Sequence, residues 1–180
     1  EEIEKVGQNI KYDIEVLRNY GITIKGPLFD TMIAHYLLQP ELRHNMDDMA
    51  ETYLHYKTIH IDQLIGAKGK DQLSMRSLAP EQIVDYACED ADITLQLKNI
   101  FEPKLKEEGL YPLFKEVEMP LIYVLAEMEC NGVKLDVQAL SEVSKTFNEQ
   151  LSQYEQKIYE LTGETFNISS PKQVGTILFE

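Results

Sequence analysis

Long amphipathic helical patterns fill most of this 180-residue chain after residue 79, and they constrain its fold more than any other feature. A helix is predicted to begin at Pro80, because proline is favoured at the first helical position, and to end at Gly109. Pro103 predicts a kink or break of this helix near Phe101. Three further helices are predicted, over residues 113–130, over residues 136–161 with Asp136 as the N-cap, and from 171 onwards. We therefore expect an all-helical second half.

Strand-like segments are few and short. Residues 6–10 are typical of a strand, followed by a helix over residues 13–20 and an extended piece at 22–24. Two more helices are predicted, over residues 31–38, capped by Asp30, and over residues 46–54. Such a short strand cannot form a sheet alone. Either the fold is mainly helical, or the partner strands belong to residues that precede Glu1.

The chain is acidic, with 17 Lys and Arg against 31 Asp and Glu and a net charge of −14. This balance argues against a broad non-specific clamp on a phosphate backbone, so any nucleic-acid contact should be local or metal-assisted. Cys88 and Cys130 lie in apolar helical patterns and not in a metal-ligand spacing, which predicts two buried, reduced thiols. No apolar run is long enough for a membrane span and no leader is visible, so a cytoplasmic protein without a membrane is expected.

Tyr86 and Asp90 carry the clearest chemical signal. Side chains four residues apart share a face of a helix. A carboxylate there can hold a divalent cation, and a phenol beside it can contact the water that the cation activates. These are functional groups that metal-assisted phosphodiester hydrolysis requires. The spacing alone has low specificity.

Asp13 is a second candidate, because it stands where a strand-like run gives way to a helix. At such a junction an aspartate can point into a cleft. The alternative is a helix N-cap, a position that favours aspartate. Judged alone, Asp13 fits the cap better.

Both ends of the chain suggest part of a longer polypeptide. The first residue is not methionine and stands in mid-pattern, and the last residues stop inside an apolar helical repeat.

Three motifs in order resemble the proofreading 3′→5′ exonuclease domain of the bacterial family A DNA polymerases, in the tyrosine subclass of the four-carboxylate exonucleases. They are Asn9-x-x-Tyr12-Asp13, Phe29-Asp30-Thr31 and Tyr86-x-x-x-Asp90-Ala-Asp92. Ribonuclease D and the RecQ-associated exonucleases share this core. The later segments at 118–121, 131–136 and 166–173 separate them, because these resemble the start of a polymerase domain leading into its thumb.

The resemblance implies the fold and the domain division. The expected fold is an α/β ribonuclease H-like exonuclease domain that lacks its N-terminal strands, and is therefore mainly helical here, followed by an all-α segment. Residues 1–108 would be the C-terminal part of the exonuclease domain. Residues 109–180 would be the N-terminal helical part of the polymerase domain.

The resemblance also implies a site with two divalent metal ions, Mg²⁺ or Mn²⁺. Asp90 corresponds to the ligand of the more tightly held ion, and Asp13 to a carboxylate that reaches the other ion largely through water. Tyr86 corresponds to the tyrosine that orients the attacking water. Asp30 and Asp92 are not expected to be ligands.

DNA is the implied partner, as a single-stranded 3′ end at the exonuclease site and as primer-template in the parent protein. Asn9 and Tyr12 would face the single-stranded end. Arg43 would meet a phosphate, or would equally well be a solvated turn residue. We expect a monomer.

One departure from the family pattern bears on activity. The first motif, an Asp-x-Glu that supplies the other two carboxylates, should lie upstream of Glu1, and the polymerase palm aspartates are also missing. The resemblance implies a DNA polymerase I with 3′→5′ exonuclease as the parent. Because these carboxylates are missing, we expect little or no activity from this chain alone. Two alternatives stay open: a non-catalytic DNA-binding or scaffold module with a degenerate exonuclease fold, and a ribonuclease D-like exoribonuclease.

Overall fold

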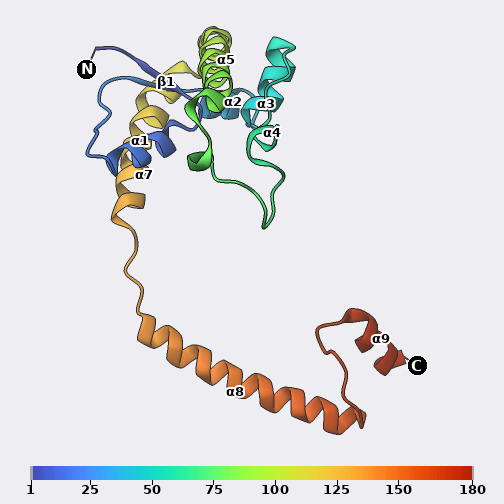
Figure 1. Cartoon of the computed structure of the whole chain (residues 1–180). Helices are drawn as coiled ribbons and strands as arrows, with labels where there is room; N and C mark the ends of the chain where they lie inside the picture. The colour runs from blue at the N-terminus through green and yellow to red at the C-terminus, as the bar shows by residue number, and fades with distance from the viewer. Residues whose placement is uncertain (1, 180) are drawn as a thin grey trace. The chain divides into compact units, whose positions relative to one another are not determined.

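The computed structural model describes residues 2–179 and divides the chain into two compact units, Glu1–Gly132 and Val133–Glu180 (Figure 1). Glu1 and Glu180 themselves lie outside the described residues. The structure is mainly helical with one small two-stranded sheet, as the resemblance implies.

The sheet pairs β1 (Lys5–Gly7) with β2 (Leu28–Asp30) in parallel, with Val6 opposite Phe29. A parallel pair needs a crossover connection, which here contains α1 (Ile10–Arg18). The strand is shorter than residues 6–10, and the helix begins earlier than residue 13. Asn9, the N-cap of α1, adopts a left-handed backbone with φ 58°, which asparagine tolerates better than most residues.

Asp30 is the N-cap of α2 (Thr31–Leu38), as predicted, and its carboxylate accepts the backbone N–H groups of Met32 and Ile33. Four short helical elements follow α2. They are α3 (Met46–Met49), η1 (Ala50–Leu54), α4 (Asp62–Ile65) and η2 (Met75–Ser77).

The long helix α5 (Pro80–Glu107) runs unbroken for 28 residues, so the predicted break near Phe101 is wrong. Pro103 is exposed, while Phe101 and Leu105 on either side of it are fully buried. Their burial holds the helix together across the position where proline removes one backbone donor. The predicted helix over residues 113–130 is divided into α6 (Tyr111–Leu113), η3 (Phe114–Glu118) and α7 (Met119–Asn131).

The core of the first unit lies where α5 packs against α2, β1 and η1, and where α1 packs against α7. Its largest fully buried side chains include Phe29, Phe101 and Phe114. The rings of Phe29 and Phe114 lie 4.8 Å apart between centroids, which joins the sheet to η3. Ion pairs Lys11–Glu129 and Arg18–Glu127 add surface links between α1 and α7.

The prediction of two buried thiols is wrong, because Cys88 and Cys130 are both exposed. The buried positions of α5 begin only at Ile93, so Cys88 lies on a part of the helix that has no core beneath it. Cys130 lies beyond the last buried residue of α7, Ala126. An apolar helical pattern indicates which face is favoured for burial, but not how far along the helix the core extends.

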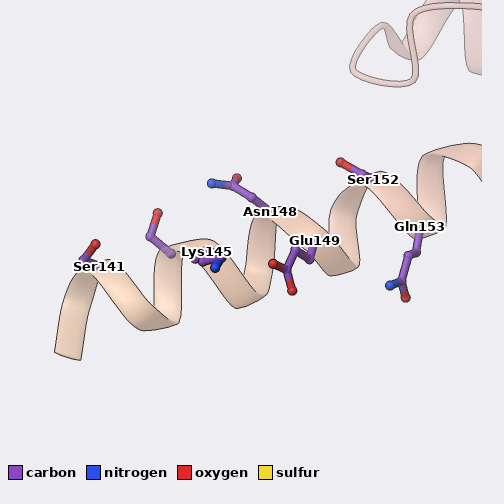
Figure 2. Close-up of a pocket in the computed structure, with 7 residues that line it drawn as sticks. Ser141, Lys145, Asn148, Glu149, Ser152 and Gln153 are labelled. Carbon is purple, nitrogen blue, oxygen red and sulfur yellow. The ribbon is translucent and has the colours of Figure 1, made fainter. Parts of the chain in front are cut away.

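The second unit consists of α8 (Val137–Thr162) and α9 (Pro171–Phe179). The Asp136 side chain accepts the N–H of Ala139 at 2.9 Å and caps α8, as predicted, and Gly163 ends the helix with φ 79°. None of the residues that the structure describes in α8 or α9 is buried. Figure 2 shows a polar hollow whose labelled side chains all project from α8 alone, so it is an open helix face. Within residues 2–179, no helix is long and apolar enough to cross a membrane.

Candidate active site

Tyr86 and Asp90 lie together on one face of α5, where the phenol and the carboxylate shift each other's pKa through charge and hydrogen bonding. Burial, followed by the charge of Asp90 and this hydrogen bond, raises the pKa of Tyr86 to about 12. Tyr86 is therefore a neutral donor at physiological pH, able to hold an oxygen atom in place but not to act as a base.

Asp90 has an oxygen atom without a protein partner. Its Oδ1 is buried and accepts no hydrogen bond from the residues that the structure describes. Burial, and then the charges of Glu89 and Asp47, raise the pKa of Asp90 against the effect of the Tyr86 hydrogen bond. An unsatisfied buried carboxylate oxygen is costly. It is also a suitable ligand for a hard divalent cation, which prefers oxygen donors. The unpartnered carboxylate oxygen of Asp90 therefore makes this residue a suitable ligand for a divalent metal ion.

Two acidic residues near this pair were missed by sequence reasoning. Glu89 accepts hydrogen bonds from the Tyr56 hydroxyl and the Ile59 N–H, each at 2.7 Å. Asp47, from α3, adds negative charge to the surroundings of both Tyr86 and Asp90. Glu89 could have been noticed as the neighbour of Asp90 in an acidic run. No local signal points to Asp47, because its place depends on tertiary contacts.

Asn9, Tyr12 and Asp13 lie together at the start of α1. Asn9 and Tyr12 are exposed, Tyr12 to 63%. Asp13 is in the first turn and is not the N-cap, so the capping alternative for it is wrong. Its side chain is exposed by surface area, yet the protein around the carboxyl still raises its pKa by desolvation.

A different carboxylate holds this helix start in place. Asp30 Oδ2 accepts the N–H of Ile10 at 2.7 Å, while Oδ1 accepts the N–H groups of Met32 at 2.9 Å and Ile33 at 3.1 Å. Only 1% of Asp30 is exposed, and burial raises its pKa in spite of these hydrogen bonds. Its oxygens are occupied by backbone donors, so Asp30 is a structural residue.

Arg43 lies close to the segment that carries Asn9. The carbonyl oxygen of His44 accepts a hydrogen bond from the Gln8 side chain at 2.8 Å, which joins the neighbours of the two residues. Arg43 itself is exposed.

Asp13 and Asp90 lie on different helices, α1 and α5. The charges that shift the pKa of Asp90 come from Glu89 and Asp47, and Asp13 is not among them. Over residues 2–179, no three His, Cys, Asp or Glu side chains gather in a way that could hold a metal ion. The structure therefore brings Tyr86 to Asp90 on α5, and it places Asn9, Tyr12 and Asp13 together at the start of α1.

Comparisons with known proteins agree along the whole chain. A family model for the 3′-5′ exonuclease of the A-type DNA polymerases matches residues 1–106. DNA polymerase I of Pseudomonas aeruginosa is 41% identical over 98% of this chain, and that of Borreliella burgdorferi is 43% identical over 97%. The chain spans 20% and 19% of the length of these two relatives.

A solved structure is also similar over nearly the whole chain. It is described as the POL domain of Pol1 from M. smegmatis in complex with DNA primer-template and dNTP. The match has a TM-score of 0.79 and 26% identity, and it covers 98% of this chain and 27% of that one. On the family model and these relatives together, the chain belongs to the 3′-5′ exonuclease family of the DNA polymerase I proteins.

Proposed function

We propose that this chain supplies part of a 3′→5′ proofreading exonuclease site within a DNA polymerase I. The observation that carries the proposal is the Tyr86–Asp90 pair, in which a neutral phenol donor lies beside a carboxylate with one buried, unpartnered oxygen. Both residues lie inside the segment that matches the exonuclease family. The parent protein would combine this activity with DNA-directed DNA synthesis.

Two divalent ions, Mg²⁺ or Mn²⁺, would complete the site, with Asp90 holding one and Asp13 reaching the other largely through water. When bound, such ions polarise the terminal phosphodiester, supply hydroxide and stabilise the leaving 3′ oxygen. The Tyr86 hydroxyl would form a hydrogen bond with the attacking water and hold it in position. A nearby cation would also offset the charges of Glu89 and Asp47, which add to burial in raising the pKa of Asp90.

The substrate would be a single-stranded 3′ end of DNA. The exposed Asn9 and Tyr12 would contact it, and the Tyr12 ring offers a surface on which a base can stack. Arg43, tied to the same region through the hydrogen bond between Gln8 and His44, would meet a phosphate. This local arrangement suits a chain whose overall charge repels a phosphate backbone.

For the fold, we infer a ribonuclease H-like exonuclease domain over residues 1–108 and the start of the polymerase domain over residues 109–180. The family match to residues 1–106 supports the first of these ranges. Helix α7 packs on α1, so the first part of the polymerase segment shares a compact unit with the exonuclease segment. We further propose a monomer that acts in the bacterial cytoplasm, as befits a relative of bacterial DNA polymerases.

The chain alone is proposed to have little or no nuclease activity. Its described residues hold no cluster of three metal-ligating side chains, and a two-metal site needs more carboxylates than Asp13 and Asp90 supply.

Trimming of an end-labelled oligonucleotide by the full-length polymerase tests the proposed function. We expect the wild-type protein with Mg²⁺ to shorten single-stranded DNA from its 3′ end, and Asp90→Asn to abolish this with unchanged circular dichroism. Asp92→Asn, which changes a neighbouring exposed carboxylate, is the matched control. Full activity in Asp90→Asn, or trimming of RNA in preference to DNA, would contradict the proposal.

A further inference from the structure

The half of α5 that carries the candidate site has no anchor in the hydrophobic core. All buried residues of this helix lie from Ile93 onwards, while Tyr86 and Asp90 are half-buried in its first part. Hydrophobic packing fixes the second half of the helix and leaves the position of the first half to polar contacts. A shift of about 1 Å in a reacting group can lower a rate by about 100-fold.

Glu89 provides those polar contacts. Its two carboxylate oxygens are used separately: Oε1 accepts the Tyr56 hydroxyl and Oε2 accepts the Ile59 N–H, both at 2.7 Å. Among the described residues, the other side-chain hydrogen bonds of residues 80–92 stay within α5 and its cap. Glu89 is therefore the link between the turn that carries Asp90 and the segment of residues 55–60.

That segment is itself held from its other side. The buried Thr58 donates its hydroxyl to Asp47 Oδ1 at 2.7 Å, and the Tyr56 N–H reaches the Ala50 carbonyl at 3.2 Å. Asp47 belongs to α3 and Ala50 to η1. Both elements contact the core-anchored part of α5, through Met46 beside Thr94 and through the Tyr53 ring against Phe101. The chain of contacts thus runs from the core, through residues 55–60, back to the unanchored half of the same helix.

We propose that Glu89 is a positioning residue that holds Tyr86 and Asp90 in place by clamping the first half of α5 to residues 55–60. The inference rests on the proposed exonuclease function, since it assigns to Glu89 a task for that site. Both carboxylate oxygens of Glu89 accept hydrogen bonds from protein donors, so its role in this proposal is positional. Outer contacts of this kind typically change activity or metal affinity by about 10- to 100-fold when they are removed.

Two substitutions separate the position of Glu89 from its charge. Glu89→Ala removes both hydrogen bonds. Glu89→Gln removes the charge but keeps an oxygen for the Ile59 N–H, and the Tyr56 hydroxyl can turn to accept from the new amide. If Glu89 acts through its position, Glu89→Gln should keep most of the exchange protection and trimming activity that Glu89→Ala loses.

The test combines a local and a functional measurement. In the 180-residue chain, we expect Glu89→Ala to speed amide hydrogen exchange at residues 86–90 by at least about tenfold, with exchange at residues 97–105 unchanged. In the full-length polymerase, we expect kcat for single-strand trimming to fall about 10- to 100-fold in Glu89→Ala, with KM within about twofold and recovery in Glu89→Gln. The control Asp92→Asn, which lies three residues after Glu89 on the same helix, should behave as wild type.

Every outcome decides the inference. Unchanged exchange at residues 86–90, or a Gln variant as impaired as the Ala variant, overturns it. If Glu89→Ala does not fold, Tyr56→Phe removes one of the two hydrogen bonds from an exposed tyrosine, and the same local exchange is expected to rise by a smaller factor. Should Asp90→Asn keep full trimming, the proposed function fails, whereas the exchange measurement still tests the clamp by itself.

Discussion

At the scale of the residue, Asp30 shows how one buried carboxylate can organise two helix starts. It accepts three backbone N–H groups, one from the beginning of α1 and two from the beginning of α2. These donors have no partner within their own helices, so a side chain must satisfy them. The segment with Asn9 and Asp13 consequently takes its position from a residue that has no role in the proposed chemistry.

Substitution of Asp30 should destabilise the protein in two steps. Asn keeps one oxygen and can serve one helix start, whereas Ala serves neither and leaves buried N–H groups unpaired. We expect losses in the free energy of unfolding of about 1–2 kcal/mol for Asp30→Asn and about 2–4 kcal/mol for Asp30→Ala. Urea denaturation followed by circular dichroism measures both. Equal losses in the two variants would show that the separate use of the two oxygens is unimportant.

His35 is a buried group whose protonation should lower stability. It is 2% exposed, lies 2.8 Å from His44 between the Nδ1 atoms, and contacts the Tyr53 hydroxyl at 3.0 Å. Burial, and then the charges of His44 and Lys104, lower its pKa. The histidine at position 35 therefore binds a proton more readily in the unfolded chain than in the folded one. The stability that neutral His35 contributes is complete above a pH of about 6.5 and is lost as the pH falls below it.

Comparison of the wild type with His35→Gln at pH 7.5 and 5.5 isolates this contribution. We expect the wild type to lose more free energy of unfolding on acidification than the variant, by at most about 1.4 kcal/mol per pH unit. The raised pKa values of Asp13, Asp30 and Asp90 act in the opposite direction, but they are common to both proteins. An identical pH dependence in the two proteins would contradict the assignment.

At the scale of the element, local signals predicted what depends on local chemistry. The caps at Asp30 and Asp136 were predictable, because aspartate satisfies free N–H groups wherever a helix begins. The proximity of Tyr86 and Asp90 follows from helix geometry alone. The course of α5 through Pro103 was not predictable, because burial of Phe101 and Leu105 outweighs the penalty for proline. The contact of Glu89 with Tyr56 spans 33 residues and is decided only by the packed fold.

The tight connection from β1 to α1 makes a prediction for Gly7. A Cβ atom at this position would lie 2.8 Å from both Cβ and Cγ1 of the buried Ile10. Because neither the strand nor the buried side chain can move freely, we expect Gly7→Ala to lower the free energy of unfolding by about 1–3 kcal/mol, as measured by urea denaturation.

Gly175→Ala is the matched control for this substitution. It lies within α9 with nothing within 4 Å of the added Cβ, so no loss is expected and a gain of up to about 1 kcal/mol is possible for a helix interior. A neutral Gly7→Ala would mean that the connection is looser than the contact distances indicate.

At the scale of the whole molecule, the residues that the structure describes form one hydrophobic core. The buried core residues lie between Ile10 and Ala126, all in the first unit. In the proposed function, metal ions would bridge this strongly acidic protein and DNA, because a bound cation reverses the local charge. The chain spans about a fifth of the length of its polymerase relatives, and in the proposed function the rest of the site would come from the longer protein.

Calorimetric titration with Mn²⁺ tests the central claim most directly, that Asp90 is a metal ligand in a site that this chain supplies only in part. We expect two-site binding to the full-length polymerase, loss of the tighter site in Asp90→Asn, and weak or no binding to the 180-residue chain. Unchanged binding in Asp90→Asn would contradict the account, and so would tight two-site binding to the 180-residue chain alone.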